Sequence, residues 1–408
     1  MKKTASRLAL AAGFGLVASS AFAADLGGNC CADLEERIAE LEATTVRKGN
    51  RVVSLEVSGH VHQAIMFFDV DAGANSERNE YIGTPNTSRS RFRFKGAAKI
   101  SSDLSAGYLL EIGVRSNGLS ATDQNNPRVS QGLDIRHEAL YIDSKRYGRV
   151  WLGQTAEAIE GITEINLGGA LNNSPDFLLA GPGSMLSTAG AEATEFVGVT
   201  GEQAGEGNRV EMIRYISPTL MGFTFSASWG EDDTWSVAGR YAGEFNGIRV
   251  AGGIGYKDIV DDVAGSAFNT NDGYQLGMSA SVLHVPTGLY LTGQYGENGD
   301  DVRDETDHNW YVTAGIARKF IALGRTNIYG KYGEYDRDIG TLTSNTAVAA
   351  VSAESLGYGI GIEQKVDSAA MDLYVVWNHF EGEAFSTGGQ VVDTIDIDSV
   401  TVGARIQF

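Results

Sequence analysis

The sequence has few of the residues that stabilise large secreted soluble proteins. Its 408 residues include six prolines and only two cysteines, Cys30 and Cys31. Two adjacent cysteines cannot provide a framework of disulfides, and vicinal cysteines rarely bridge each other without strain. They could join two chains or remain free thiols, and the sequence leaves both possibilities open.

An excess of positive charge and long apolar runs are also absent. The chain has 32 Lys and Arg against 52 Asp and Glu, a formal net charge of −20, which argues against nucleic acid as a partner. Beyond the N-terminal region, no stretch approaches the roughly 18 apolar residues that indicate a transmembrane helix. No G-x-S-x-G motif or phosphate-binding loop occurs, so we expect neither enzyme activity nor a cofactor.

The N-terminus resembles an export signal. Three basic residues precede an apolar stretch at 8–17, and Ala21, Phe22 and Ala23 form an A-x-A cleavage site. This order is typical of a secretory signal peptide. The sequence therefore predicts a signal peptide at 1–23 and a chain that folds outside the cytoplasm.

One short helical pattern follows, in the segment 24–50. Its apolar stripe repeats at spacings of three and four, through Cys31, Leu34, Ile38, Leu41 and Thr45. Two heptads are marginal for an isolated helix. The segment could form a small coiled-coil bundle with the same segment of neighbouring subunits, or a single amphipathic helix packed on its own chain or left mobile.

From residue 51 onward, apolar and polar side chains alternate with a period of two. This alternation is typical of strands with one apolar and one polar face, and a strand that crosses a membrane needs about 9–11 residues. Sixteen segments fit, at about 53–68, 88–100, 106–115, 135–143, 148–155, 208–216, 222–230, 234–243, 248–257, 273–284, 289–296, 309–319, 326–335, 355–366, 371–380 and 396–408.

The connections between these segments alternate in length. Short turns such as 101–105 and 285–288 alternate with longer loops, which we place at 69–87, 116–134, 258–272, 297–308, 336–354 and 381–395. Short periplasmic turns and longer extracellular loops are typical of outer-membrane barrels. Residues 51–408 are therefore predicted to form an all-β fold, a sixteen-stranded antiparallel transmembrane β-barrel wide enough to enclose water.

The second predicted strand carries a concentrated row of basic side chains. Arginine or lysine in contact with lipid costs about 2–4 kcal/mol at the bilayer midplane, so this row should face the lumen. A solvated face that merely tolerates charge is the alternative. The predicted basic wall comprises Arg89, Arg91, Arg93 and Lys95, joined by Arg115 and Arg149 on later strands, with the direction of Arg136 ambiguous.

The longest connection, 156–207, is predicted to supply the opposing carboxylates. A loop of this length is usually functional, and its apolar stretch at 162–171 suits a position against the barrel wall better than an exposed one. Candidate partners of the basic wall are Glu157, Glu160, Glu164 and Asp176. His60 and His62 could bind a metal, but a role as polar lumen-lining residues is favoured, and no metal site is predicted.

Several stretches resemble the alphaproteobacterial general porins. They are DLEERIAELEAT at 33–44, RKGNR at 47–51 leading into VSG at 57–59, EINLGGA at 164–170 and RYISP at 214–218. The resemblance implies a homotrimer of sixteen-stranded barrels, with the loop at 156–207 narrowing each pore. It also implies that Phe408 is read by the barrel assembly machinery.

These features together predict a bacterial outer-membrane porin. It would be surrounded by outer-membrane lipids and would let small hydrophilic solutes and ions diffuse through a water-filled channel. A substrate-specific channel and, less favoured, an outer-membrane β-barrel enzyme are the alternatives. The sequence does not predict the sign of ion selectivity, because the net charge of the chain need not match the charge at the constriction.

Overall fold

Nearly all of the chain whose structure is described forms β-strands. The computed structural model describes residues 52–172, 181–196, 204–230, 233–260, 273–300, 305–338 and 350–408. The predicted signal peptide at 1–23, the predicted helical segment at 24–50 and Asp176 lie outside the described residues. In the described part of the chain, no helix is long and apolar enough to cross a membrane.

The named strands follow one another along the chain with few helical turns between them. The helical elements are η1 (Gly73–Asn75), η2 (Leu119–Ala121), α2 (Ala193–Phe196) and η4 (Asp367–Ala369). The strands are β1 (Glu56–Asp71), β2 (Glu77–Gly83), β3 (Arg91–Lys99), β4 (Leu104–Arg115), β5 (Gly132–Ser144), β6 (Gly148–Ala156), β7 (Arg209–Ile216), β8 (Phe223–Gly230), β9 (Trp235–Phe245), β10 (Ile248–Ile259), β11 (Gly273–His284), β12 (Leu289–Asp300), β13 (Glu305–Ile321), β14 (Gly324–Asp338), β15 (Ser352–Val366), β16 (Met371–Phe385) and β17 (Val391–Gln407).

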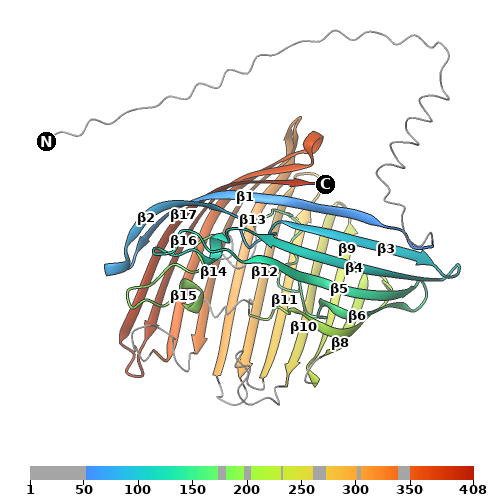
Figure 1. Ribbon diagram of the computed structural model, residues 1–408, viewed down its shortest axis with the longest axis horizontal. Coiled ribbons are helices and arrows are strands. Elements are labelled where there is room, and N and C mark those ends of the chain that lie inside the picture. The colour runs from blue at the N-terminus through green and yellow to red at the C-terminus, as the bar shows by residue number, and fades with distance from the viewer. Residues whose placement is uncertain are drawn as a thin grey trace, which may run out of the picture. The chain divides into compact units, whose positions relative to one another are not determined.

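Antiparallel pairing of neighbouring strands closes the sheet into a barrel (Figure 1). From β3 onward each strand pairs with the next, and β17 pairs with β1. β2 and β3 both pair with the same edge of β1, β2 beside its second half and β3 beside its first. They therefore act as one interrupted strand, and the structure confirms the predicted closed barrel of sixteen antiparallel strands.

The apolar face of the strands is the outer face of the barrel. Phe223, Phe225 and Trp229 of β8 are 47%, 54% and 55% exposed, whereas Ser226 and Ser228 between them are buried. The same alternation recurs around the barrel, with large apolar side chains exposed at every second position. Such a continuous apolar outer surface is expected where lipid replaces water.

Several strands extend further than predicted, and one was missed. The missed strand is β2, which lies inside the predicted loop 69–87. The strands on either side of the predicted loops 297–308 and 381–395 extend into them, so that only 301–304 and 386–390 lie between strands. The predicted strand at 88–100 begins only at Arg91. The reason is physical: beyond the lipid, hairpins continue to pair through their backbones while polar side chains occupy both faces, so the apolar alternation that marks a membrane strand is lost.

Glycines on the inner face of β11 and β12 make room for the 157–208 segment. A Cβ atom at Gly277 would overlap the carbonyl oxygen of Gly205, and one at Gly296 would overlap that of Ala204. Packing at this density leaves no space for even one additional methyl group. These glycines therefore allow the backbone of the segment to lie directly on the barrel wall.

Replacing Gly296 with valine should detach the segment from the wall. We expect Gly296→Val to fold into a barrel but to expose the 157–208 segment to added protease. Gly293→Val is the matched control, because a Cβ at Gly293 on the same strand meets no atom within 4 Å. Identical proteolysis of the two folded variants would contradict this account.

Candidate functional site

The segment 157–208, which joins β6 to β7, folds back into the lumen. Its first part follows the inner wall across many strands. The Ala158 N–H donates to Ser236 Oγ on β9 at 3.0 Å, and the Leu171 N–H donates to Glu363 Oε2 on β15 at 2.6 Å. Serine and carboxylate side chains on the lumen face thus position the segment strand by strand.

The later part of the segment covers an apolar area of the lumen wall. Ser187 Oγ donates to Asp393 Oδ2 on β17 at 2.6 Å, and the Ala189 N–H donates to Asp393 Oδ1 at 2.7 Å. Phe196 of α2 and Met66 of β1 are completely buried in the same cluster. Apolar side chains on the lumen face are removed from water there, which stabilises the folded-back position by about 25 cal/mol per Å² buried.

Glu206 ties the two ends of the segment together. Its carboxylate accepts hydrogen bonds from the Gly161 N–H and from both the N–H and the hydroxyl of Thr163. Burial, followed by the nearby Glu164, raises the pKa of Glu206 to about 8. The group is therefore largely neutral at pH 7 and contributes little negative charge to the lumen.

Three arginines of β3 and β5 share one buried carboxylate of β4 on the lumen face. Glu111 of β4 has a side chain with no exposed surface. Arg91 Nη1 lies 3.1 Å from Glu111 Oε1, Arg136 Nε donates to the same oxygen at 2.7 Å, and Arg93 binds Oε2. One negative charge faces three positive charges, so this arginine cluster (Arg91, Arg93 and Arg136) carries excess positive charge.

Two further arginines lie beside the cluster, Arg89 just before β3 and Arg115 at the end of β4. Arg89 Nη2 is 2.5 Å from Asp134 Oδ2, and Arg115 Nη1 donates to Asn86 Oδ1 at 3.1 Å. Arg89 was predicted to lie within a strand, but it belongs to the interruption between β2 and β3.

Two histidines hold this interruption against the lumen face of β1. His60 Nε2 is 3.0 Å from the Ser88 carbonyl oxygen, and His62 Nδ1 is 3.0 Å from the same atom. Ser88 has a positive φ of 51°, which non-glycine residues seldom adopt. Both histidines therefore have a structural role in the lumen, as favoured by the sequence.

The comparison of the sequence with known families places this geometry in context. Residues 8–384 match the Gram-negative porin family. The chain belongs to the Gram-negative porins. A porin of this family is an outer-membrane channel through which solutes diffuse passively.

Solved structures of outer-membrane channels share the fold of this porin. The anion-selective porin of Comamonas acidovorans is 17% identical, with a TM-score of 0.56 over 87% of this chain and 100% of its own. OmpF of Salmonella typhi, solved with daunomycin, is 14% identical, with a TM-score of 0.51 over 88% and 99%. The DcaP channel of Acinetobacter baumannii is 12% identical, with a TM-score of 0.54 over 88% and 99%. Curated protein sequences gave no match.

Two predicted members of the basic wall lie apart from the arginine cluster. Lys95 Nζ pairs with Glu56 Oε1 at 2.8 Å, and both side chains are about half exposed. Arg149 Nε pairs with Asp143 Oδ1 at 2.8 Å, and its guanidinium lies 4.3 Å from the Tyr141 ring centroid. Asp143 lies opposite Ser105 of β4, six residues from Glu111. The Arg149–Asp143 pair is therefore about 20 Å along the strand from the arginine cluster.

The predicted carboxylates of the segment have different partners. Glu160 pairs with Arg209 at the start of β7, whereas Glu157 Oε2 is 3.0 Å from Lys257 Nζ. Glu164 is exposed at its surface, and desolvation of its carboxyl raises its pKa despite the opposing influence of the Arg209 and Arg136 charges. Glu160 and Glu164 therefore face the arginines, while Glu157 anchors the segment to β10.

Phe408 lies on the outer face at the end of the chain. Its backbone exchanges two hydrogen bonds with Gly59 of β1, at 2.9 and 3.0 Å, and its side chain is 64% exposed. Recognition of this residue by the assembly machinery stays a prediction.

The sequence reasoning missed several residues of the site. Glu111, Asp134 and Arg209 complete the charge pattern, and Arg136 had been left ambiguous. A signal was available for Glu111, because it interrupts the apolar run of Leu109, Leu110 and Ile112 at a lumen-facing position. A lone carboxylate in such a run indicates a cationic partner.

Neutralising Glu111 should increase the positive charge of the arginine cluster. We expect Glu111→Gln to shift the reversal potential under a salt gradient toward the anion limit, because one negative charge is removed among three guanidinium groups. Asp143→Asn is the matched control, since it breaks a similar lumen ion pair away from the cluster. Equal shifts in both folded variants would show that the cluster is not at the constriction.

Proposed function

We propose that this porin is a general diffusion channel whose constriction favours small anions over cations. The observation that carries the proposal is the sharing of one buried carboxylate, Glu111, by Arg91, Arg93 and Arg136. Charged side chains that line a narrow part of a pore bias the passage of ions of the opposite sign.

The charges that surround the cluster support an excess of positive charge. Arg89, Arg115 and Arg209 add to the three arginines of the cluster, while Asp134, Glu160 and Glu164 add to Glu111. Six cationic groups therefore face four carboxyl groups. Desolvation also raises the pKa of Glu160 and of Glu164, which weakens the negative contribution of the segment further.

The negative charge of the whole chain does not oppose this proposal. Ions in solution screen exposed charges over about 8–10 Å at physiological ionic strength. The net charge of −20 is summed over the entire chain, whereas a permeating ion responds most strongly to groups within that distance. The local balance at the constriction therefore decides the selectivity.

Neutralising two arginines of the cluster tests the proposed selectivity. We expect the wild type to show an anion-side reversal potential in planar bilayers, and Arg91→Gln/Arg93→Gln to lower the anion-to-cation permeability ratio several-fold. Lys95→Gln is the control, because Lys95 lies on the same strand but pairs with Glu56 outside the cluster. A cation-selective wild type would contradict the proposal. Saturable block by one solute class would instead indicate a substrate-specific channel.

We further propose that the mature porin is exported with cleavage of residues 1–23 and assembles as a homotrimer of the alphaproteobacterial branch. The motifs at 33–44 and 164–170 support this branch. A structure of OmpT from Vibrio cholerae in a trimer form has the same fold, with 14% identity and a TM-score of 0.55 over 88% of this chain.

The trimer proposal predicts the behaviour of the purified protein. Light scattering in detergent should give three protein copies per particle, and the conductance should close in three equal steps under high voltage. A single copy per particle and single-step closure would contradict a trimer while leaving the channel itself in place.

A further inference from the structure

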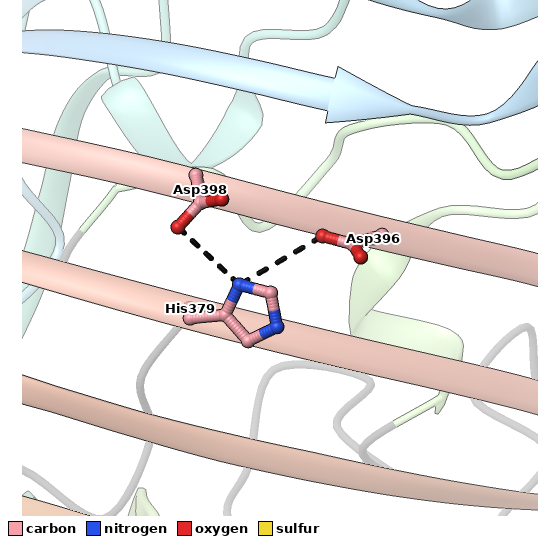
Figure 2. Close-up of side chains that lie close together, drawn as sticks. All are labelled: His379, Asp396 and Asp398. Carbon is pink, nitrogen blue, oxygen red and sulfur yellow. Dashed lines mark hydrogen bonds and ion pairs between the residues drawn. The ribbon is translucent and has the colours of Figure 1, made fainter.

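We propose that the outer face of the barrel binds a divalent transition-metal ion such as Zn²⁺ between β16 and β17. His379 of β16 and Asp396 and Asp398 of β17 supply the ligand atoms, as Figure 2 shows. One nitrogen and two carboxylate oxygens from these residues lie within 4.8 Å of one another.

The pairing register places all three side chains on one face. His379 is directly opposite Asp398, and Asp396 is two residues further along β17. Side chains two residues apart on a strand point to the same side. The buried Phe380 and Ile397 at the intervening positions belong to the lumen side, so His379 and the two aspartates point outward.

The distances between the ligand atoms are compatible with a tetrahedral metal complex. His379 Nδ1 is 3.3 Å from Asp398 Oδ1 and 3.8 Å from Asp396 Oδ1. With metal–ligand distances of about 2.1 Å, neighbouring ligand atoms of a tetrahedral ion lie about 3.4 Å apart. A water molecule would provide the fourth ligand.

The surroundings of the imidazole orient its ligand nitrogen toward the aspartates. Glu381 Oε1 lies 2.8 Å from His379 Nε2. The other ring nitrogen, Nδ1, faces Asp396 and Asp398 (Figure 2). Histidines that bind metals commonly donate their other nitrogen to a carboxylate in this way.

Aromatic side chains restrain two of the proposed ligands, His379 and Asp398. The Tyr358 ring centroid is 4.8 Å from that of His379, and Trp377 Nε1 donates to Asp398 Oδ1 at 3.0 Å. The His379 side chain is only 10% exposed. The ligands are thus restrained before an ion arrives, which reduces the entropy lost on binding.

An acidic cavity of about 510 Å³ adjoins the site and shares Glu381 and Asp396 with it. Asp71, Asp336 and Glu354 are among its other carboxylates, and every charged residue on its described lining is acidic. Such a concentration of one sign of charge raises the local concentration of cations. We therefore expect the ion to enter the site from the aqueous phase, through this acidic cavity.

A choice among metals follows from the ligand types. Imidazole nitrogen together with carboxylate oxygens suits Zn²⁺ and its neighbours in the first transition row, whereas Ca²⁺ and Mg²⁺ prefer oxygen ligands only. Binding of Zn²⁺ should therefore exceed binding of Ca²⁺ at equal concentration.

Calorimetry with Zn²⁺ on the full-length folded protein, freed of metal by chelator, tests the proposal. We expect saturable binding that His379→Ala abolishes and that Glu381→Gln weakens by about 10–100-fold. His308→Ala is the matched control, because His308 pairs with Asp336 at 3.0 Å but belongs to no three-residue ligand set among the described residues.

Absorption by bound Co²⁺ provides a second measurement, because it reports the coordination geometry of the ion. Wild type and His308→Ala should give the strong visible absorption of tetrahedral Co²⁺, and His379→Ala should lose it while retaining the heat-dependent gel shift of a folded barrel. If His379→Ala fails to fold, Asp398→Asn replaces it in both measurements. Equal Zn²⁺ affinity in the wild type and the folded site variant, or no binding by the wild type, would overturn the proposal.

Discussion

The rest of the structure depends on the satisfaction of backbone hydrogen bonds inside a lipid bilayer. Each unpaired N–H or C=O group in hydrocarbon costs several kcal/mol, so an open sheet edge cannot remain there. The pairing of β1 with β17 removes the last edge and extends from His60 opposite Gln407 to Asp71 opposite Asp396. A slip of one residue in this register would exchange the lipid-facing and lumen-facing side chains.

This fixed register determines where charge can reside. In β3, Arg91 and Arg93 share one parity and face the lumen, where Glu111 and water compensate their charge. Beyond the lipid, the outer face no longer has to be apolar, and the same parity places His379, Asp396 and Asp398 together outside. One geometric rule therefore produces both the arginine cluster in the lumen and the proposed metal site outside.

A barrel of sixteen strands is too wide for its own side chains to fill, and the 157–208 segment occupies part of the lumen. It is positioned by inward glycines such as Gly277 and Gly296, by lumen-facing side chains such as Asp393, and by its own Glu206. The segment packs on the inner wall from β9 to β17, and its Glu160 pairs with Arg209. The width and charge of the pore thus depend on contacts far apart in the sequence.

The alternation of apolar and polar residues was enough to predict the barrel, its strand number and the lumen position of Arg91 and Arg93. It could not predict the interruption at 84–90, because that depends on the contacts of His60 and His62 with Ser88 across two strands. Periodicity also indicates only which face of the sheet a residue occupies, and not its height along the barrel. Arg149 was therefore grouped with Arg93, although the two lie about 20 Å apart along the strands. The sharing of Glu111 by three arginines likewise depends on the register of three strands.

The central claim is that the 157–208 segment narrows the pore against the arginine cluster. Single-channel conductance of a variant in which residues 158–206 are replaced by a short Gly-Ser linker tests this claim most directly. The account predicts a folded channel whose conductance is several-fold higher than that of the wild type and whose ion selectivity is weaker. A folded variant with unchanged conductance would show that the constriction lies elsewhere.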